Sequence, residues 1–357
     1  MTKGRAHRTD YSGRNYLSAV EAARYLRKTV RDVHILVKKD LVRCTVSSSG
    51  QMRFRLSDLD EYRRLYGNVQ QEKRGMLPRV SDLTVNGTRQ RIIAGNSQKM
   101  EEISDSSVHL AITSPPYFDA KMYSGRHIEG NLGDIHDSEK WFNEIEEVWR
   151  ETYRVLQPGR RLFINIMNLP VRLENGSFRA LNLTGRTVDL CERIGFIFKR
   201  DIVWQKTNSV RAHFGSYPYP GGILINNAHE FILEFEKPSR GSRRKYAHLT
   251  PEQKERSKLN REFWISIKKS DVWRMAPEGS GDNRTHVAQF PLDLPARLIR
   301  AFSFEGETVL DPFCGSGATL LAAAGLGRNG VGYEVVEEIA SEAVNSLMNF
   351  KQFHVKE

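Results

Sequence analysis

The sequence predicts an α/β protein with a largely parallel sheet, preceded by a small basic domain of short helices and a hairpin. From residue 83 onward, short apolar runs alternate with helical segments, as in strands joined by crossover helices. Residues 67–82 are polar, basic and interrupted by glycine and proline, which is typical of a linker. The 357 residues are 39% hydrophobic, enough for one large domain and one small one.

The net charge of +11 is concentrated at the start of the chain. Residues 1–79 contain 18 Lys and Arg but 8 Asp and Glu, and the rest of the chain is nearly neutral. This uneven distribution of charge favours a polyanionic partner, because phosphates that are neutralised on binding release counterions. A solubilising tail is the alternative. No apolar stretch is long enough for a membrane helix, and three scattered cysteines form neither a zinc nor a disulfide pattern. We therefore expect a cytoplasmic protein with reduced thiols and no metal.

The first domain is predicted from capping residues and apolar spacing. Ser18 is expected to cap a helix over residues 20–26, and helical spacing predicts a second helix over 29–39. Residues 41–56 alternate like a hairpin around a Ser-Ser-Ser-Gly turn. Ser57, with an acidic residue three positions later, is expected to open a third helix as a capping box does.

This arrangement makes residues 17–66 resemble the winged helix-turn-helix of the excisionase and MerR-like DNA-binding families. With the basic arm before it, the predicted DNA-binding domain spans residues 1–66. The resemblance implies that the second helix enters the major groove while the wing contacts the DNA backbone. The residues implied are Arg31, His34, Lys38 and Lys39 on the helix and Arg53 and Arg55 on the wing. A helical protein-interaction module is the alternative.

Residues 83–357 are expected to form the larger domain around the parallel sheet, with antiparallel strands late in the order. One long helix is predicted over residues 138–156 from its apolar spacing. Strands are predicted from short apolar runs at residues 91–95, 108–114, 161–168, 195–204, 229–237, 308–313 and 330–335.

The sharpest motif is Thr113-Ser114-Pro115-Pro116-Tyr117, directly after an apolar strand. Proline fixes φ and has no N–H, so two consecutive prolines make a rigid tip. The carbonyl oxygens of Ser114 and Pro115 are then held in one direction as preorganised acceptors. An ordinary proline turn is the alternative for this tetrapeptide in isolation.

The second motif, DPFCGSGAT at residues 311–319, lies between an apolar strand and a helical run. Its glycines allow the backbone to approach a ligand closely. Glu334 ends the next strand 23 residues after Asp311, where an acidic side chain typically contacts ribose hydroxyls. The motif lacks the GK[ST] of a phosphate-binding loop, which favours a nucleoside-type cofactor without a triphosphate.

Together, TSPPY and DPFCGSGAT resemble the amino-methyltransferase family of DNA methyltransferases over roughly residues 83–345. TSPPY precedes the cofactor turn, as in the circularly permuted group called class beta, an order that is possible when domain termini lie close together. The resemblance implies a Rossmann-like sheet that binds S-adenosyl-L-methionine. It also implies direct methyl transfer to an exocyclic amino nitrogen of a base flipped out of double-stranded DNA.

The resemblance assigns roles to individual residues. Ser114 and Pro115 would accept hydrogen bonds from the base amine, Pro116 would stiffen the tip, and Tyr117 would stack on the base. Asn96, which would approach the adenine of the cofactor, stands where the family usually has Asp. The full cofactor-binding set is Asn96, Phe290, Pro291, Asp311, Phe313, Gly315, Ser316, Gly317, Thr319 and Glu334.

Two basic and aromatic stretches, about residues 206–228 and 238–285, lie outside the predicted sheet and are expected to be target-recognition insertions. The candidate DNA contacts in them are Lys206, Arg211, Arg243, Arg244 and Lys245. Thr250, followed by proline, is expected to open a helix within the second stretch.

Three further residues invite chemical roles but favour structural ones. His229 and Glu230 suit polar positions at a strand end rather than acid-base catalysis. Cys314 lies inside the cofactor turn, where packing is expected rather than nucleophilic attack on a base.

Ser114 favours cytosine N4 as the acceptor, because Ser at this position of the resembling family is more often associated with cytosine and Asp with adenine. We therefore expect a sequence-specific cytosine-N4 DNA methyltransferase in the bacterial cytoplasm, associated with the nucleoid. An adenine-N6 enzyme, an RNA methyltransferase and a non-catalytic DNA-binding regulator are the alternatives. The sequence contains no convincing nuclease cluster, so a partner restriction endonuclease would be a separate chain.

Overall fold

The computed structural model divides the chain into two compact units, Met1–Met76 and Leu77–Glu357. The boundary between the two units falls within the linker predicted over residues 67–82. The structure describes residues 15–26, 30–38, 42–47, 51–66, 79–117, 128, 130–172, 178–207, 225, 227–239, 246–277 and 290–351.

The first unit has three helices and a three-stranded antiparallel sheet in the order β1-β3-β2. Its core contains Leu17, Val33, Phe54 and Leu59, all fully buried. The elements are β1 (Tyr16–Ser18), α1 (Ala19–Leu26), α2 (Val30–Lys38), β2 (Thr45–Val46), β3 (Met52–Arg55) and α3 (Leu56–Tyr66).

The predicted start of the first helix is confirmed, but that of the third is wrong. Ser18 Oγ accepts a hydrogen bond from Glu21 N–H at 3.3 Å, and Ser18 N–H donates to Glu21 Oε2 at 2.9 Å, which forms a capping box. Helix α3 begins at Leu56, directly after β3, so Ser57 lies inside its first turn. The sheet decides this boundary, because Leu56 N–H still donates to Asn15 O at 3.2 Å beside β1.

The second unit is built on a nine-stranded sheet in the order β12-β10-β11-β7-β6-β13-β14-β5-β4. Strands β4 and β11 run antiparallel to their neighbours, and all other adjacent pairs are parallel. This confirms the predicted mixed α/β class. The strands are β4 (Val80–Val85), β5 (Thr88–Ala94), β6 (Val108–Thr113), β7 (Leu156–Ile166), β10 (Ile197–Lys206), β11 (His229–Glu236), β12 (Val272–Met275), β13 (Thr308–Asp311) and β14 (Asn329–Glu334).

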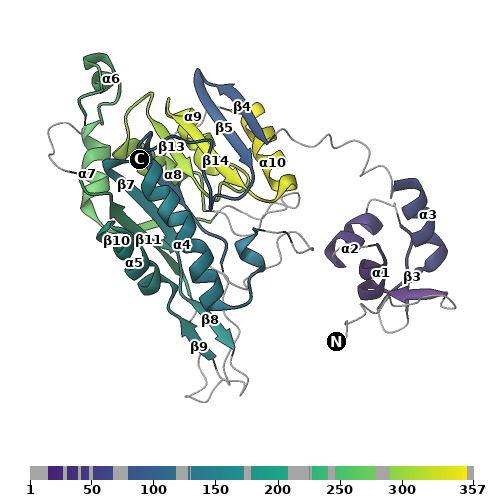
Figure 1. Cartoon of the computed structure of the whole chain (residues 1–357). Helices are drawn as coiled ribbons and strands as arrows, with labels where there is room; N and C mark the ends of the chain where they lie inside the picture. Colours follow the sequence, from purple (N-terminus) through teal and green to yellow (C-terminus); the bar gives the residue numbers. More distant parts are fainter. Residues whose placement is uncertain are drawn as a thin grey trace. The chain divides into compact units, whose positions relative to one another are not determined.

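Helices cover both faces of this sheet (Figure 1). Helices α4 (Ser138–Val155) and α5 (Leu183–Ile194) pack on one face, where Trp141 and Trp149 are fully buried. The other face is covered by α8 (Asp293–Phe302), α9 (Ala318–Gly325) and α10 (Glu337–Met348). The remaining elements are the short helix η1 (Leu132–Asp134), the hairpin β8 (Leu169–Arg172) and β9 (Phe178–Leu181), α6 (Pro251–Arg256) and α7 (Arg261–Lys269).

Two predicted boundaries are wrong because short strands pair within the sheet. The linker expected over residues 67–82 overlaps β4, which begins at Val80 and pairs with β5. Similarly, the insertion expected over 238–285 contains β12, which pairs in parallel with β10 and buries Trp273. The helix start at Thr250 is confirmed, with a capping box to Gln253. Within the described ranges, no helix has the length and apolar character needed to cross a membrane.

Candidate active site

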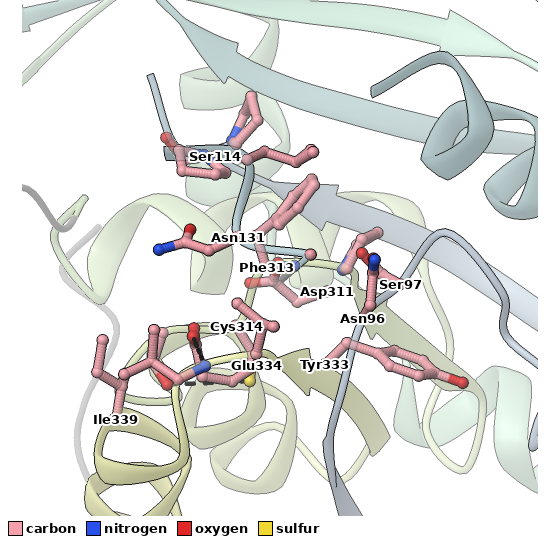
Figure 2. Close-up of a pocket in the computed structure, with 18 of the residues that line it drawn as sticks. Asn96, Ser97, Ser114, Asn131, Asp311, Phe313, Cys314, Tyr333, Glu334 and Ile339 are labelled. Carbon is pink, nitrogen blue, oxygen red and sulfur yellow. Dashed lines mark hydrogen bonds between the residues drawn. The ribbon is translucent and has the colours of Figure 1, made fainter. Parts of the chain in front are cut away.

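The carboxyl ends of β5, β6, β13 and β14 meet at one edge of the sheet, where parallel α/β folds place their ligand sites. A pocket at this edge brings together both sequence motifs (Figure 2). All four residues of the proline tip, Ser114 to Tyr117, line the pocket, together with six of the predicted cofactor residues. These ten residues are Asn96, Ser114, Pro115, Pro116, Tyr117, Phe290, Asp311, Phe313, Gly315 and Glu334.

Four predicted cofactor residues do not line the pocket, although each is next in sequence to a residue that does. Pro291 O accepts a hydrogen bond from Leu294 N–H at the start of α8. Gly317 has φ +92°, a left-handed conformation that favours glycine, at the N-cap of α9. Thr319 faces Asp311, and Ser316 lies in the turn before α9.

A buried carboxylate joins the two motifs. Asp311 Oδ1 accepts hydrogen bonds from Thr113 Oγ1 at 2.7 Å and from Phe313 N–H at 3.0 Å. Its Oδ2 accepts from Thr319 Oγ1 at 2.6 Å. Burial raises the pKa of Asp311 to about 6, although these hydrogen bonds act in the opposite direction. Since Thr113 immediately precedes Ser114, the proline tip is fixed against the glycine turn.

Glu334 presents a second carboxylate to the pocket from the end of β14. Its Oε1 accepts a hydrogen bond from Val336 N–H at 2.9 Å. Burial raises the pKa of Glu334 to about 7, while hydrogen bonds from the backbone of Val336 and Gly315 lower it. The residue as a whole is partly exposed and lines the pocket, so it is placed to accept hydrogen bonds from a ligand.

Asn131 is a pocket residue that the sequence did not reveal. Its Oδ1 accepts from Gly133 N–H at 3.1 Å and caps η1, whereas its buried Nδ2 has no hydrogen-bond partner among the described residues. Figure 2 shows Asn131 between Ser114 and Glu334. A buried donor left without an acceptor costs about 1–3 kcal/mol, so this amide marks a position where a ligand acceptor fits.

The rest of the lining is mainly small or apolar and was also not predicted. Val336 and Ile339, at the start of α10, face the same pocket as Phe313 and can enclose a flat ring. Their only sequence signal is that they follow Glu334. The other members of this set are Gly95, Ser97, Gly130, Leu132, Pro312, Cys314, Ala318, Tyr333 and Val335.

Asn96 and Cys314 are both engaged in local contacts. Asn96 Oδ1 accepts from Gln98 N–H at 2.9 Å, and its side chain packs so closely on Gly130 that a Cβ there would lie 2.8 Å from Nδ2. Burial raises the pKa of the Cys314 thiol, and Glu334 and Asp311 raise it further. A neutral buried thiol is a poor nucleophile, which favours packing.

The predicted DNA contacts are only partly described. On β3, Arg53 and Arg55 are exposed, and Arg55 Nε donates to Tyr16 Oη at 2.8 Å. His34 is half-buried on α2. Lys206 forms an ion pair within the chain, with Nζ 2.6 Å from Glu230 Oε1. Lys39, Arg211, Arg243, Arg244 and Lys245, and the side chains of Arg31 and Lys38, lie outside the described residues.

A second ionisable cluster lies at the opposite ends of β6 and β13. His109, His248 and Glu307 approach one another closely enough to bind a cation, but the buried guanidinium of Arg160 already pairs with Glu307. Thr308 N–H donates to His109 Nδ1 at 3.1 Å, and burial lowers the pKa of His109 to about 4. This cluster is therefore an internal ion-pair network that links strands.

Residues 108–345 match the N6/N4 family of DNA methylases, which covers more than half of the chain and both motifs. The chain therefore belongs to this family. It is a site-specific, S-adenosylmethionine-dependent DNA methyltransferase of the N4/N6 class. The pocket fits that cofactor, since Asn131 offers a donor that has no partner among the described residues and Glu334 offers a carboxylate at the pocket wall.

Relatives and solved structures agree with this assignment. Type II methyltransferase M.MjaI of Methanocaldococcus jannaschii is 36% identical over 277 residues, which cover 70% of this chain and 88% of that protein. The structure of TTHA0409 from Thermus thermophilus, described as a DNA modification methylase complexed with S-adenosyl-L-methionine, is 33% identical with a TM-score of 0.58, covering 73% of this chain and 95% of that one. The cytosine-N4-specific PvuII DNA methyltransferase shares the fold, with 17% identity and a TM-score of 0.50 over 73% of this chain and 93% of that one.

Proposed function

We propose that this chain methylates the exocyclic N4 of cytosine in duplex DNA, by direct transfer from S-adenosylmethionine to a flipped base. The observation that carries the proposal is the hydrogen bond from Thr113 to Asp311, which fixes the Ser114-Pro115 tip against the glycine turn at one pocket. The site that would accept hydrogen bonds from an amine and the cofactor site are then held in fixed positions relative to one another. Ser114 at the tip supports cytosine over adenine.

The tip residues act on the amine of the base. The lone pair of a nucleobase amine is delocalised into the ring, so the nitrogen is a poor nucleophile. Hydrogen bonds from its two N–H groups to the carbonyl oxygens of Ser114 and Pro115 favour the pyramidal, reactive form. Tyr117 stacks on the extruded ring and holds it in line with the cofactor.

The other pocket residues hold the cofactor. When bound, S-adenosylmethionine supplies a methyl group on a positively charged sulfur, which is the leaving group. Glu334 accepts hydrogen bonds from the ribose hydroxyls. Asn131 Nδ2 donates to an acceptor of the cofactor, while Phe313, Val336 and Ile339 enclose its adenine.

We also propose that the first unit is a winged helix-turn-helix that binds DNA through α2 and the exposed arginines of β3. The order of the two motifs supports the permuted class beta arrangement. Because several relatives are named type II methyltransferases, we propose that the methyl mark protects DNA from a separately encoded restriction endonuclease.

The modified nucleoside tests the proposed function. Duplex plasmid DNA from a methylation-deficient host is incubated with the protein and methyl-labelled cofactor, digested to nucleosides and analysed by mass spectrometry. We expect N4-methylcytosine; N6-methyladenine would refute the choice of base. A protein that retards DNA in a gel but transfers no label would instead be a regulator, and label on RNA alone would indicate an RNA enzyme.

Substitutions in the tip test the division of roles. Pro115→Ala and Tyr117→Ala are expected to nearly abolish methyl transfer while the dissociation constant for the cofactor stays within about twofold, because neither residue is assigned to cofactor binding. Calorimetric titration with S-adenosylhomocysteine measures that constant. Loss of cofactor binding in either variant would show that the two sites are misplaced.

A further inference from the structure

A buried polar network surrounds the hydroxyl of Tyr117. The hydroxyl donates to Glu230 Oε2 at 3.0 Å, and Asn165 Nδ2 donates to the same oxygen at 2.6 Å. Lys206 Nζ lies 2.6 Å from the other oxygen, Oε1. The four side chains come from the segment after β6 and from β7, β10 and β11, which are neighbours in the sheet (Figure 1).

Sheet register brings these residues to the active-site edge. Thr113 pairs with Ile164, so Asn165 is level with Ser114, the first residue of the tip. Trp204 pairs with Glu230, which places the start of β11 beside the end of β10. Because β11 is antiparallel to β7 and β10, its amino end meets their carboxyl ends. A glutamate at that end can therefore reach Tyr117.

The carboxylate at the centre of this network is buried and has compensating partners. Glu230 is 7% exposed and Asn165 is 2% exposed. A buried carboxylate is tolerated only when a cation and hydrogen-bond donors compensate for lost solvation, and Lys206, Asn165 and Tyr117 do so. Asn165 is oriented so that its donor serves Glu230, although its Oδ1 then has no hydrogen-bond partner in the described part of the chain. The opposite orientation would place two acceptors face to face.

We propose that Glu230 is a positioning residue that fixes the ring of Tyr117 for stacking on the target base, and that the ion pair with Lys206 holds the Glu230 side chain in place. This inference rests on the proposed function. The hydrogen bond restrains rotation of the ring before DNA binds, so less ordering remains when the base enters. In this proposal, Lys206 supports the active site through Glu230 and is not the phosphate contact that its sequence context suggested. Glu230 is correspondingly more than a structural residue at a strand end.

A double-mutant cycle tests the proposal in the full-length protein with cofactor bound. Tyr117→Phe keeps the ring and removes the hydroxyl. Glu230→Gln replaces the carboxylate by a neutral amide that is surrounded by hydrogen-bond donors. We expect kcat for methyl transfer to fall about 3- to 10-fold in each single variant, the size of a lost hydrogen bond. The double variant should have a kcat within about twofold of that of the less active single variant, because both substitutions act on the same charge-assisted bond: one removes its donor and the other removes the charge of its acceptor.

Glu234→Gln is the matched control. Glu234 is equally buried on β11 and pairs with Arg161 and Arg200, away from the tip. We expect this variant to lower the melting temperature and leave kcat per folded molecule unchanged. In Glu230→Gln, kcat should instead fall while KM for DNA and cofactor affinity stay within about twofold.

Lys206→Met separates the two roles of the lysine. Loss of kcat at an unchanged salt dependence of DNA binding supports the proposal. A higher KM for DNA, with a salt slope reduced by about one and kcat unchanged, would assign Lys206 to phosphate binding and overturn its role in the proposal.

Multiplicative losses in the double-mutant cycle, or an unchanged kcat in Glu230→Gln, would overturn the role of Glu230. A wild-type protein that methylates no DNA would refute the proposed function itself.

Discussion

Glu334 should make cofactor binding depend on pH near neutrality. Its raised pKa of about 7 means that a large fraction of the unliganded protein carries a protonated Glu334 at pH 6. In the proposed binding mode, ribose hydroxyls would donate to the ionised carboxylate, so binding should tighten as pH rises and level off above about pH 8. Below pH 7, the dissociation constant should rise by up to about tenfold per pH unit. Calorimetric titration with S-adenosylhomocysteine between pH 5.5 and 8.5 measures this slope.

Glu334→Gln is the control for that experiment. The ionisation of the free ligand is the same in both experiments, so the difference between the two profiles reports Glu334 together with its electrostatic coupling to Asp311. The variant should bind the ligand more weakly at pH 8 and lose most of the pH dependence. Identical profiles would show that Glu334 does not contact the cofactor.

Asn131→Asp tests the buried amide. Aspartate retains the oxygen that caps η1 through Gly133 but replaces the Nδ2 donor by an acceptor. We expect cofactor affinity to fall about tenfold or more, because a ligand acceptor would then face an acceptor. Unchanged affinity, with the melting temperature also unchanged, would mean that Nδ2 contacts no part of the cofactor.

At the scale of single residues, the sequence predicts those functional residues that lie in a recognisable local motif. Pro115 and Gly315 lie in dense motifs beside apolar strands, and the structure brings both to one pocket. Asn131 has no such signal, since its importance depends on the unsatisfied donor of a short helix cap. Tyr117 and Glu230 are likewise joined only through strand order, which local patterns do not specify.

At the scale of elements, β14 and α9 approach closely because β14 carries glycines. A Cβ at Gly332 would lie 2.7 Å from Cys314 Cβ and 2.9 Å from Leu320 Cδ1. Gly332→Ala should therefore displace the cofactor turn and cost about 1–3 kcal/mol in the free energy of unfolding, with weaker cofactor binding. Gly95→Ala is the stability control, because among the described residues no atom beyond the two chain neighbours lies within 4 Å of the Cβ it would add. Chemical denaturation compares them, and equal stability of the two variants would contradict the close packing.

Elements with strong periodicity were predictable, and short edge elements were not. Helix α4 has Trp141, Ile145 and Trp149 buried at helical spacing, which makes it evident in the sequence. By contrast, β12 has only four residues and obtains its stability from pairing with β10. Likewise β4 gains its partner from β5, so no local signal separates it from the linker.

At the scale of the whole molecule, the charge of the first unit should govern DNA affinity. Arg53 and Arg55 are exposed on β3, and Arg53→Ala and Arg55→Ala should each lower the slope of log affinity against log salt by about one. Fluorescence anisotropy with duplex DNA at several salt concentrations measures the slope. Cofactor affinity should remain unchanged. An unaltered slope in both variants would leave the first unit without a DNA-binding role through its wing.

The bond between Thr113 and Asp311 joins adjacent strands, β6 and β13, of a single sheet. Neighbouring strands are about 4.8 Å apart, a distance that backbone pairing holds nearly constant. The cofactor turn and the proline tip therefore need no hinge to come together. No closure of one lobe on another sets the distance between these two parts of the proposed site. In the proposed mechanism, the large displacement in each turnover then falls to the nucleic acid, whose base would leave its helix and travel to a stationary frame.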